Sequence, residues 1–255
     1  WDITGAVSTL VVSGSVDGWS LAVHSEVRSL RLGDVAAADI VVEGPIGTLA
    51  ARRFVAGSIQ ADSIRTLRTT GDRRAGFAGD FGADLTLDAA FLDDGQPALR
   101  YARIAGSVTG GTWTIQGDAR TVYVNASLAA WNVAVAGDVR TLYCRTTLSG
   151  TWSANSLRLL SVRGSAQNFT LTLDQAAEDG VYALRTARVR DWLADSTILA
   201  NGHIGSIVVG VVRDSAVFAG VGSTSDADGD GVPDLPDPAA DFAAQASIAW
   251  LTVSG

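Results

Sequence analysis

The sequence repeats with a period close to 20 residues, and this repeat limits the possible folds more than any other feature. Gly117 to Val124 and Gly137 to Cys144 lie 20 residues apart and share the pattern apolar, Arg, Thr, apolar, any, apolar. The first apolar position of the pattern recurs at Val7, Val27, Ile46, Ile64, Leu99, Ala119, Val139, Leu157, Leu184 and Ile204. A second apolar arm, usually opened by Gly, lies between consecutive copies. Strands this short bury their apolar side only against neighbouring copies, so the repeat predicts a stack.

Composition favours strands over helices within each copy. The chain has no Lys or Met and only three Glu, and Glu and Lys are usual on solvated helix faces. We therefore expect an all-β chain that forms a single parallel β-solenoid, a right-handed β-helix of about ten coils. A β-propeller is disfavoured because its blades need ~40–45 residues each. Two longer spacings, Ile64 to Leu99 and Leu157 to Leu184, predict loops that leave the stack.

The repeat pattern resembles the repetitive parallel β-helix segments of bacterial secreted or cell-surface proteins. That resemblance implies an extracellular or cell-surface location and says nothing about chemistry. The chain has no apolar run of the ~18 residues that a membrane helix needs. We expect the solenoid to cover residues 1–222. An inserted loop is expected to cover residues 223–238, and residues 239–255 are expected to return to a solenoid-type strand.

The inserted loop has the spacing of a calcium site. Its expected ligands are the carboxylates of Asp226, Asp228, Asp230, Asp234 and Asp237 and the backbone carbonyl of Val232. Gly231 stands where a calcium loop turns sharply, while Pro233 and Pro236 oppose a following helix. The segment therefore resembles a thrombospondin type 3 calcium repeat more closely than an EF-hand, which implies calcium as the bound cofactor. The alternative is an acidic flexible linker.

Arginine follows the first apolar position in most copies. The series is Arg28, Arg65, Arg100, Arg120, Arg140, Arg158 and Arg185. Stacked along a solenoid, these guanidinium groups could bind a polyanion such as an acidic polysaccharide. The simpler interpretation is that each pairs with a nearby carboxylate, such as Asp118 or Asp138. Nucleic acid is not an expected partner, because the net charge is −8 and the pI is near 4.6.

Catalytic signatures are absent from the sequence. His24 and His203 have no triad partner at a recognisable spacing, and Cys144 lies at an apolar position of the repeat. We therefore expect no enzyme, with a polysaccharide lyase or hydrolase built on Asp–Arg pairs as the remaining alternative. Trp19, Trp113, Trp131, Trp152 and Trp192 lie in or beside the second arms, which predicts packing rather than a sugar-binding platform.

The two chain ends suggest the function. The terminal segment Ser247 to Gly255 resembles the opening segment Val7 to Gly14, and both ends carry a Trp, Trp1 and Trp250. We expect a secreted, rigid subunit of a fibre, matrix or surface layer that stacks head-to-tail on copies of itself and is stabilised by calcium. The alternative is an adhesin or glycan-binding stalk that uses the Arg-lined face.

Overall fold

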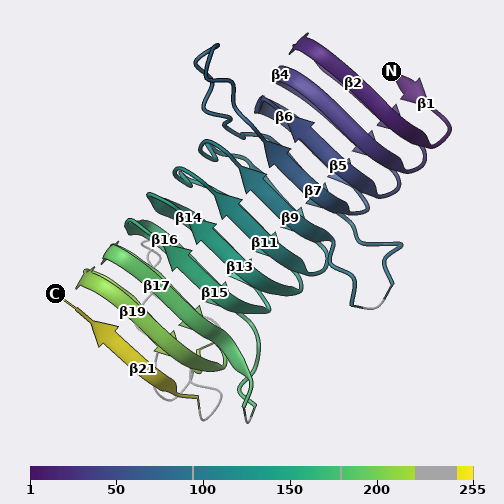
Figure 1. The fold of residues 1–255 in the computed structure, drawn as a ribbon. Helices are drawn as coiled ribbons and strands as arrows, with labels where there is room; N and C mark the ends of the chain where they lie inside the picture. Colours follow the sequence, from purple (N-terminus) through teal and green to yellow (C-terminus); the bar gives the residue numbers. More distant parts are fainter. Residues whose placement is uncertain (94, 179, 222–245, 255) are drawn as a thin grey trace, which may run out of the picture.

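The computed structural model describes residues 1–93, 95–178, 180–221 and 246–254. All regular structure in these ranges is β-strand, wound into a parallel β-solenoid (Figure 1). The expected all-β solenoid with a period near 20 residues is thus confirmed. None of the described residues forms a helix that could cross a membrane.

Each coil contributes one strand to a first ladder of parallel strands. This first ladder consists of β2 (Val7–Val16), β4 (Val27–Val42), β5 (Ile46–Ala51), β7 (Ile64–Thr69), β9 (Leu99–Ile104), β11 (Ala119–Val124), β13 (Asp138–Cys144), β15 (Ser156–Val162), β17 (Tyr182–Ala194), β19 (His203–Arg213) and β21 (Ile248–Val253). These eleven strands extend the expected ten by β21, the solenoid-type strand at the end of the sequence.

A second ladder runs along another side of the rod. It consists of β1 (Asp2–Ile3), β3 (Trp19–Val23), the end of β4, β6 (Arg53–Ala61), β8 (Asp84–Leu87), β10 (Thr112–Ile115), β12 (Asn132–Val135), β14 (Leu148–Ala154), β16 (Ala166–Leu173), β18 (Thr197–Ala200) and β20 (Ala216–Ala219). Isolated parallel bridges join successive coils on a third side, for example Phe81 with Val108 and Val108 with Leu128.

The strand register matches the repeat read from the sequence, even across the long spacings. Ile64 pairs with Leu99 and Leu157 pairs with Leu184, so the extra residues between them leave the stack as predicted. The register holds because a one-residue slip would turn every buried side chain of a strand outward.

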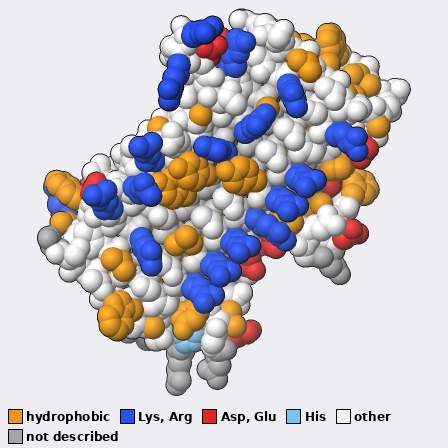
Figure 2. Space-filling model, in the orientation of Figure 1, with side chains coloured by type: hydrophobic (Ala, Val, Ile, Leu, Met, Phe, Trp, Pro, Cys, Tyr) orange, Lys and Arg blue, Asp and Glu red, His pale blue; other side chains and the backbone are white. Residues whose placement is uncertain are grey.

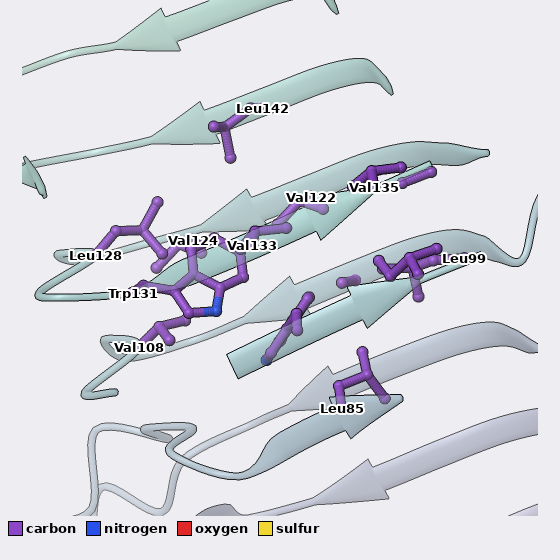
Figure 3. Packing of buried hydrophobic residues seen from close by; sticks show 14 of the residues in the cluster. Leu85, Leu99, Val108, Val122, Val124, Leu128, Trp131, Val133, Val135 and Leu142 are labelled. Carbon is purple, nitrogen blue, oxygen red and sulfur yellow. The ribbon is translucent and has the colours of Figure 1, made fainter. Parts of the chain in front are cut away.

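Inward-pointing side chains form one continuous hydrophobic core along the rod, and Figure 3 shows part of this packing around Trp131. Aromatic rings run through it in the order Phe54, Phe81, Trp113, Trp131 and Trp152, with neighbouring ring centres 4.6–5.7 Å apart. Most of these contacts are edge-to-face, an arrangement that aromatic rings favour. The three tryptophans are fully buried, as their positions predicted.

Glycines flank Trp131 in the two neighbouring coils and let the backbones approach closely. In the coils on either side of Trp131, the facing positions are Gly111 and Gly150, both with positive φ, of 90° and 106°. A Cβ at Gly150 would lie 2.3 Å from the Trp131 carbonyl oxygen. A side chain at Gly150 would therefore push one coil away from the next at Trp131.

Thr69 and Cys144 are the two residues in the apolar columns that carry a polar or ionisable side chain. The Thr69 hydroxyl donates to the Gly79 carbonyl and accepts a hydrogen bond of 3.0 Å from the Ala105 N–H. Thr69 thus ties the loop after β7 to the stack. Burial raises the pKa of the Cys144 thiol to about 11, so Cys144 is a protonated core residue at neutral pH.

Candidate functional site

Seven arginines form a column on the outer face of the first ladder, and we call this set the arginine column. Its members are Arg28, Arg65, Arg100, Arg120, Arg140, Arg158 and Arg185, all exposed. Each follows a buried residue at the start of a strand, such as Ala119 or Val139, so the alternation of the strand turns it outward. Basic side chains run as a diagonal line across this face (Figure 2).

The column is not neutralised by the acids expected to pair with it. Within the described ranges, no carboxylate oxygen lies within 4.0 Å of a guanidinium nitrogen of the column. Asp118 Oδ1 instead accepts a 2.9 Å hydrogen bond from the Asp138 N–H. Asp138 Oδ1 accepts bonds of 2.8 Å from Asn155 and from Ser156. The predicted pairing of these two aspartates with the column is therefore wrong, because both carboxylates link one coil to the next.

A hollow of about 580 Å³ opens at one end of the column. Arg28, Arg65, Arg100 and Arg120 line it together with Gly47, which interrupts the column between Arg28 and Arg65. A Cβ at Gly47 would lie 2.5 Å from the Arg28 carbonyl oxygen, so this position accepts only glycine without a shift of the backbone. The missing side chain leaves space on the surface of the rod.

A second hollow of about 300 Å³ continues along the column. Its lining includes Arg120, Arg140 and Arg158, so Arg120 belongs to both hollows. We call the two hollows together the trough. The arginine column forms its basic side for much of its length.

A second outward column runs beside the first on the same strands. Tyr123 and Tyr143 stack there with ring centres 4.4 Å apart and an angle of 3° between planes. Arg103 lies 5.8 Å from the Tyr123 ring centre and Arg163 lies 5.7 Å from that of Tyr143. The inner ring faces cover each other and the two arginines approach the outer ones, which makes the stack a poor platform for sugar rings.

Trp192 departs from the predicted packing. It is 48% exposed and lines a separate hollow with Arg190 and Asp191. The strand register is irregular between Val189 and Trp192, which shifts the tryptophan out of the buried columns.

The two ends of the stack expose apolar side chains. At one end Trp1 is 65% exposed, and at the other Trp250 and Leu251 are 65% and 55% exposed. The outermost strands of the first ladder there are β2 and β21, each paired on one side only within the described residues. Both ends thus combine apolar surface with a free strand edge.

His24 joins three successive coils near the first end. Its Nδ1 lies 2.8 Å from Glu43 Oε1, and its Nε2 lies 3.0 Å from Asp2 Oδ1. Hydrogen bonding to Glu43 and the charge of that carboxylate raise the pKa of His24 above 6.5, and Asp2 adds to the rise. The doubly protonated ring donates to both carboxylates and clasps β1 to the coils beneath it.

This clasp predicts a pH-dependent first coil. Because the folded pKa of His24 is raised, its stabilising contribution is complete below pH 6.5 and is lost as the pH rises through the folded pKa. The Ala22 amide donates a hydrogen bond to the Trp1 carbonyl. After correction for the intrinsic pH dependence of exchange, we expect this amide to exchange faster above the folded pKa of His24 than below it. Hydrogen exchange read by NMR measures this, and Glu43→Gln should lower the His24 titration midpoint. An unchanged midpoint in that variant would contradict the assignment.

The predicted calcium ligands Asp226, Asp228, Asp230, Val232, Asp234 and Asp237 lie outside the described residues. In the part of the chain that the structure describes, no group of three or more His, Cys, Asp or Glu side chains is placed to hold a metal ion. The calcium site therefore stays a prediction from the sequence.

His203 has neighbours that fit a structural role. Its Nδ1 lies 3.2 Å from Ser247 Oγ, and its ring meets Tyr182 edge-to-face at 6.4 Å. These contacts connect β19 with the neighbouring coils, as the clasp of His24 does at the other end. The expectation that the chain is not an enzyme stays a prediction.

Fold and surface together define the protein as a parallel β-solenoid whose arginine column has no carboxylate partner, and whose two ends have unpaired strand edges, among the residues that the structure describes. Comparisons with protein-family models, with curated proteins and with solved structures gave no match.

Proposed function

We propose that the protein is a structural subunit, a rigid rod that stacks head-to-tail on copies of itself into a fibre, matrix or surface layer. The observation that carries this proposal is the agreement between the two open ends. Eleven stacked strands at ~4.8 Å spacing make a rod roughly 50 Å long, and its continuous core supports stiffness.

The core columns at one end of the first ladder continue those at the other. On β21, Ile248 and Leu251 pair with Ile204 and Ile207 of β19. On β2, Val7 and Leu10 occupy the same columns, because they pair with Val27 and Leu30 of β4. A second copy stacked in this register would set Val7 on Ile248 and Leu10 on Leu251. All strands are parallel, so the two free edges have matching directions.

The second ladder matches in the same way. Following its register from coil to coil, Ala219 of β20 and Ile3 of β1 fall in one column. The same stacking would therefore extend both ladders at once. Such a contact joins two different surfaces and repeats without closing, which produces a filament.

Charge does not oppose this contact along the first ladder. The arginine column ends before either edge, since Ser8 and Ala249 occupy its positions on β2 and β21. The second outward column likewise ends at Val11 and Thr252. Stacked ends would thus bring no like charges together on these columns.

Calcium and location are parts of the proposal that rest on the sequence. In the sequence, residues 226–237 fall between β20 and β21, the two strands that form the end that would stack. Calcium bound there would neutralise clustered carboxylates near the junction. A calcium-dependent junction suits the extracellular space, where we place the protein.

The proposal predicts that particles grow longer with protein concentration. We expect electron microscopy and light scattering to show rods of increasing length for the unchanged chain in calcium. Leu251→Arg should stop growth, because it puts a charge in the core column of the junction. Val11→Arg is the matched control, since Val11 points outward and is 58% exposed.

Two results would overturn parts of this picture. Single rods of constant length at every concentration, with and without calcium, would contradict stacking. Growth that continues unchanged after chelation would remove calcium from the junction and leave the stacking itself in place.

A further inference from the structure

We infer that the trough binds a linear, carboxylated polysaccharide that lies along the rod. This inference is independent of end-to-end stacking, because the trough lies on the side of the rod and not at its ends. It rests on the arginine column, which has no carboxylate partner among the described residues, on the hollows beside it and on the hydroxyl groups that follow it in the strands.

The spacing of the column fits a polymer rather than a single anion. Parallel strands lie ~4.8 Å apart, so the arginines from Arg100 to Arg158 present guanidinium groups in consecutive coils. Holding like charges this close costs free energy, and an anionic chain would recover it by pairing with each group. Asp118 and Asp138 are engaged between coils, and Glu26 is the one other described carboxylate that lines the two hollows, so most of the counter-charge is expected to come from a ligand.

A fixed wall gives the trough its shape. The described residues 88–93 and 95–98 contribute Leu92, Gln96 and Pro97 to the lining of the larger hollow. Asp62, only 4% exposed, holds the first of these segments through hydrogen bonds of 2.9 Å, from the Phe91 N–H to Oδ1 and from the Ala89 N–H to the backbone carbonyl. The hollow is therefore built into the fold and is ready for a ligand before one binds.

The groups around the column favour a sugar polymer over a nucleic acid. A row of hydroxyls that includes Thr121 and Thr141 follows the arginines by one residue, and hydroxyls suit a ligand rich in hydroxyl groups. The stacked Tyr123 and Tyr143 cover each other, which leaves Tyr101 as the single exposed aromatic ring on the described strands that carry the trough, too few for a run of stacked bases.

Binding of defined oligomers tests this inference. The probes are oligogalacturonates of about three and about ten units, neutral dextran, and single-stranded DNA of matched charge. The affinity of each is measured by calorimetry at low and at moderate salt. We expect the longer oligogalacturonate to bind at least about tenfold more tightly than the trimer, because it contacts more arginines at once. We expect no binding of dextran and weaker binding of DNA.

A charge-matched pair of variants locates the site. Arg120→Gln, Arg140→Gln and Arg158→Gln, combined in one chain, should weaken binding of the longer oligomer by about tenfold. Arg73→Gln, Arg74→Gln and Arg213→Gln remove the same charge away from the column and should change affinity less than about threefold. All six side chains are exposed, and circular dichroism checks that both variants stay folded.

The results separate the possible outcomes. Equal losses in the two triple variants would reduce the effect to overall charge and overturn the site. No binding of oligogalacturonate to the unchanged chain, or equal affinity for trimer and longer oligomer, would also overturn it. Tighter binding of DNA than of oligogalacturonate would replace the polysaccharide with a nucleic acid. Filament growth in the same samples reports on stacking separately.

Discussion

Replacing Trp131 by alanine is expected to lower the free energy of unfolding by about 3–5 kcal/mol. Trp131 is fully buried, and its ring centre lies 4.6 Å from that of Trp113 and 5.0 Å from that of Trp152. The cavity would not collapse easily, because the backbone around it is held by pairing between coils. Guanidinium unfolding followed by far-UV circular dichroism measures the change without relying on tryptophan fluorescence.

Trp192→Ala is the matched control for this loss. It deletes the same side chain from a position that is 48% exposed, so the expected change is below about 1 kcal/mol. Trp131→Phe should cost less than the alanine variant, because it keeps an aromatic ring and removes a buried indole N–H that has no hydrogen-bond partner among the described residues. Equal losses for Trp131→Ala and Trp192→Ala would refute the role of the aromatic core.

Gly57→Ala is expected to lower the free energy of unfolding by about 2–5 kcal/mol, the combined effect of backbone strain and overpacking. Gly57 has a φ of 113°, in the left-handed region that side chains rarely adopt. A Cβ there would lie 2.0 Å from the Ala38 carbonyl oxygen of the neighbouring coil. Backbone of one coil would have to move away from the next, and the same unfolding measurement reports this cost.

Gly14→Ala provides the comparison for Gly57→Ala. No heavy atom lies within 4 Å of a Cβ at Gly14, and its φ is outside the left-handed region. We expect a change within about 0.5 kcal/mol. If both glycine variants lost the same stability, the close approach of coils at Gly57 would not be the cause.

Stacking and polymer binding are compatible on one rod. In a filament built by the proposed register, the arginine columns of successive copies would be separated by the uncharged positions Gly205, Ala249 and Ser8. Each copy would thus present its own arginine segment, and a long polysaccharide could follow several copies. Loss of polysaccharide binding without loss of filaments in the Arg120, Arg140 and Arg158 variant would show that the two properties are separate.

Much of the fold could be predicted from the sequence, because the repeat and the core impose the same constraint. A parallel ladder requires each buried residue to lie on a buried residue of the next coil, so aligning the apolar columns is equivalent to finding the register. The register read from the sequence is correct even between Ile64 and Leu99, although loops and β8 lie between these two residues in the chain. The tryptophans at 113, 131 and 152 were placed in the core by the same reasoning.

The candidate site depended on contacts that spacing does not encode. The sequence by itself determined which side of the strand carries the arginines, since alternation along a strand follows from backbone geometry. Only the tertiary structure decided that Asp118 and Asp138 bind the next coil, that Asp62 holds a loop against the column, and that His24 lies between two carboxylates. These outcomes depend on side-chain rotamers and on the return path of loops, which a repeat leaves free, whereas the buried columns leave no such freedom.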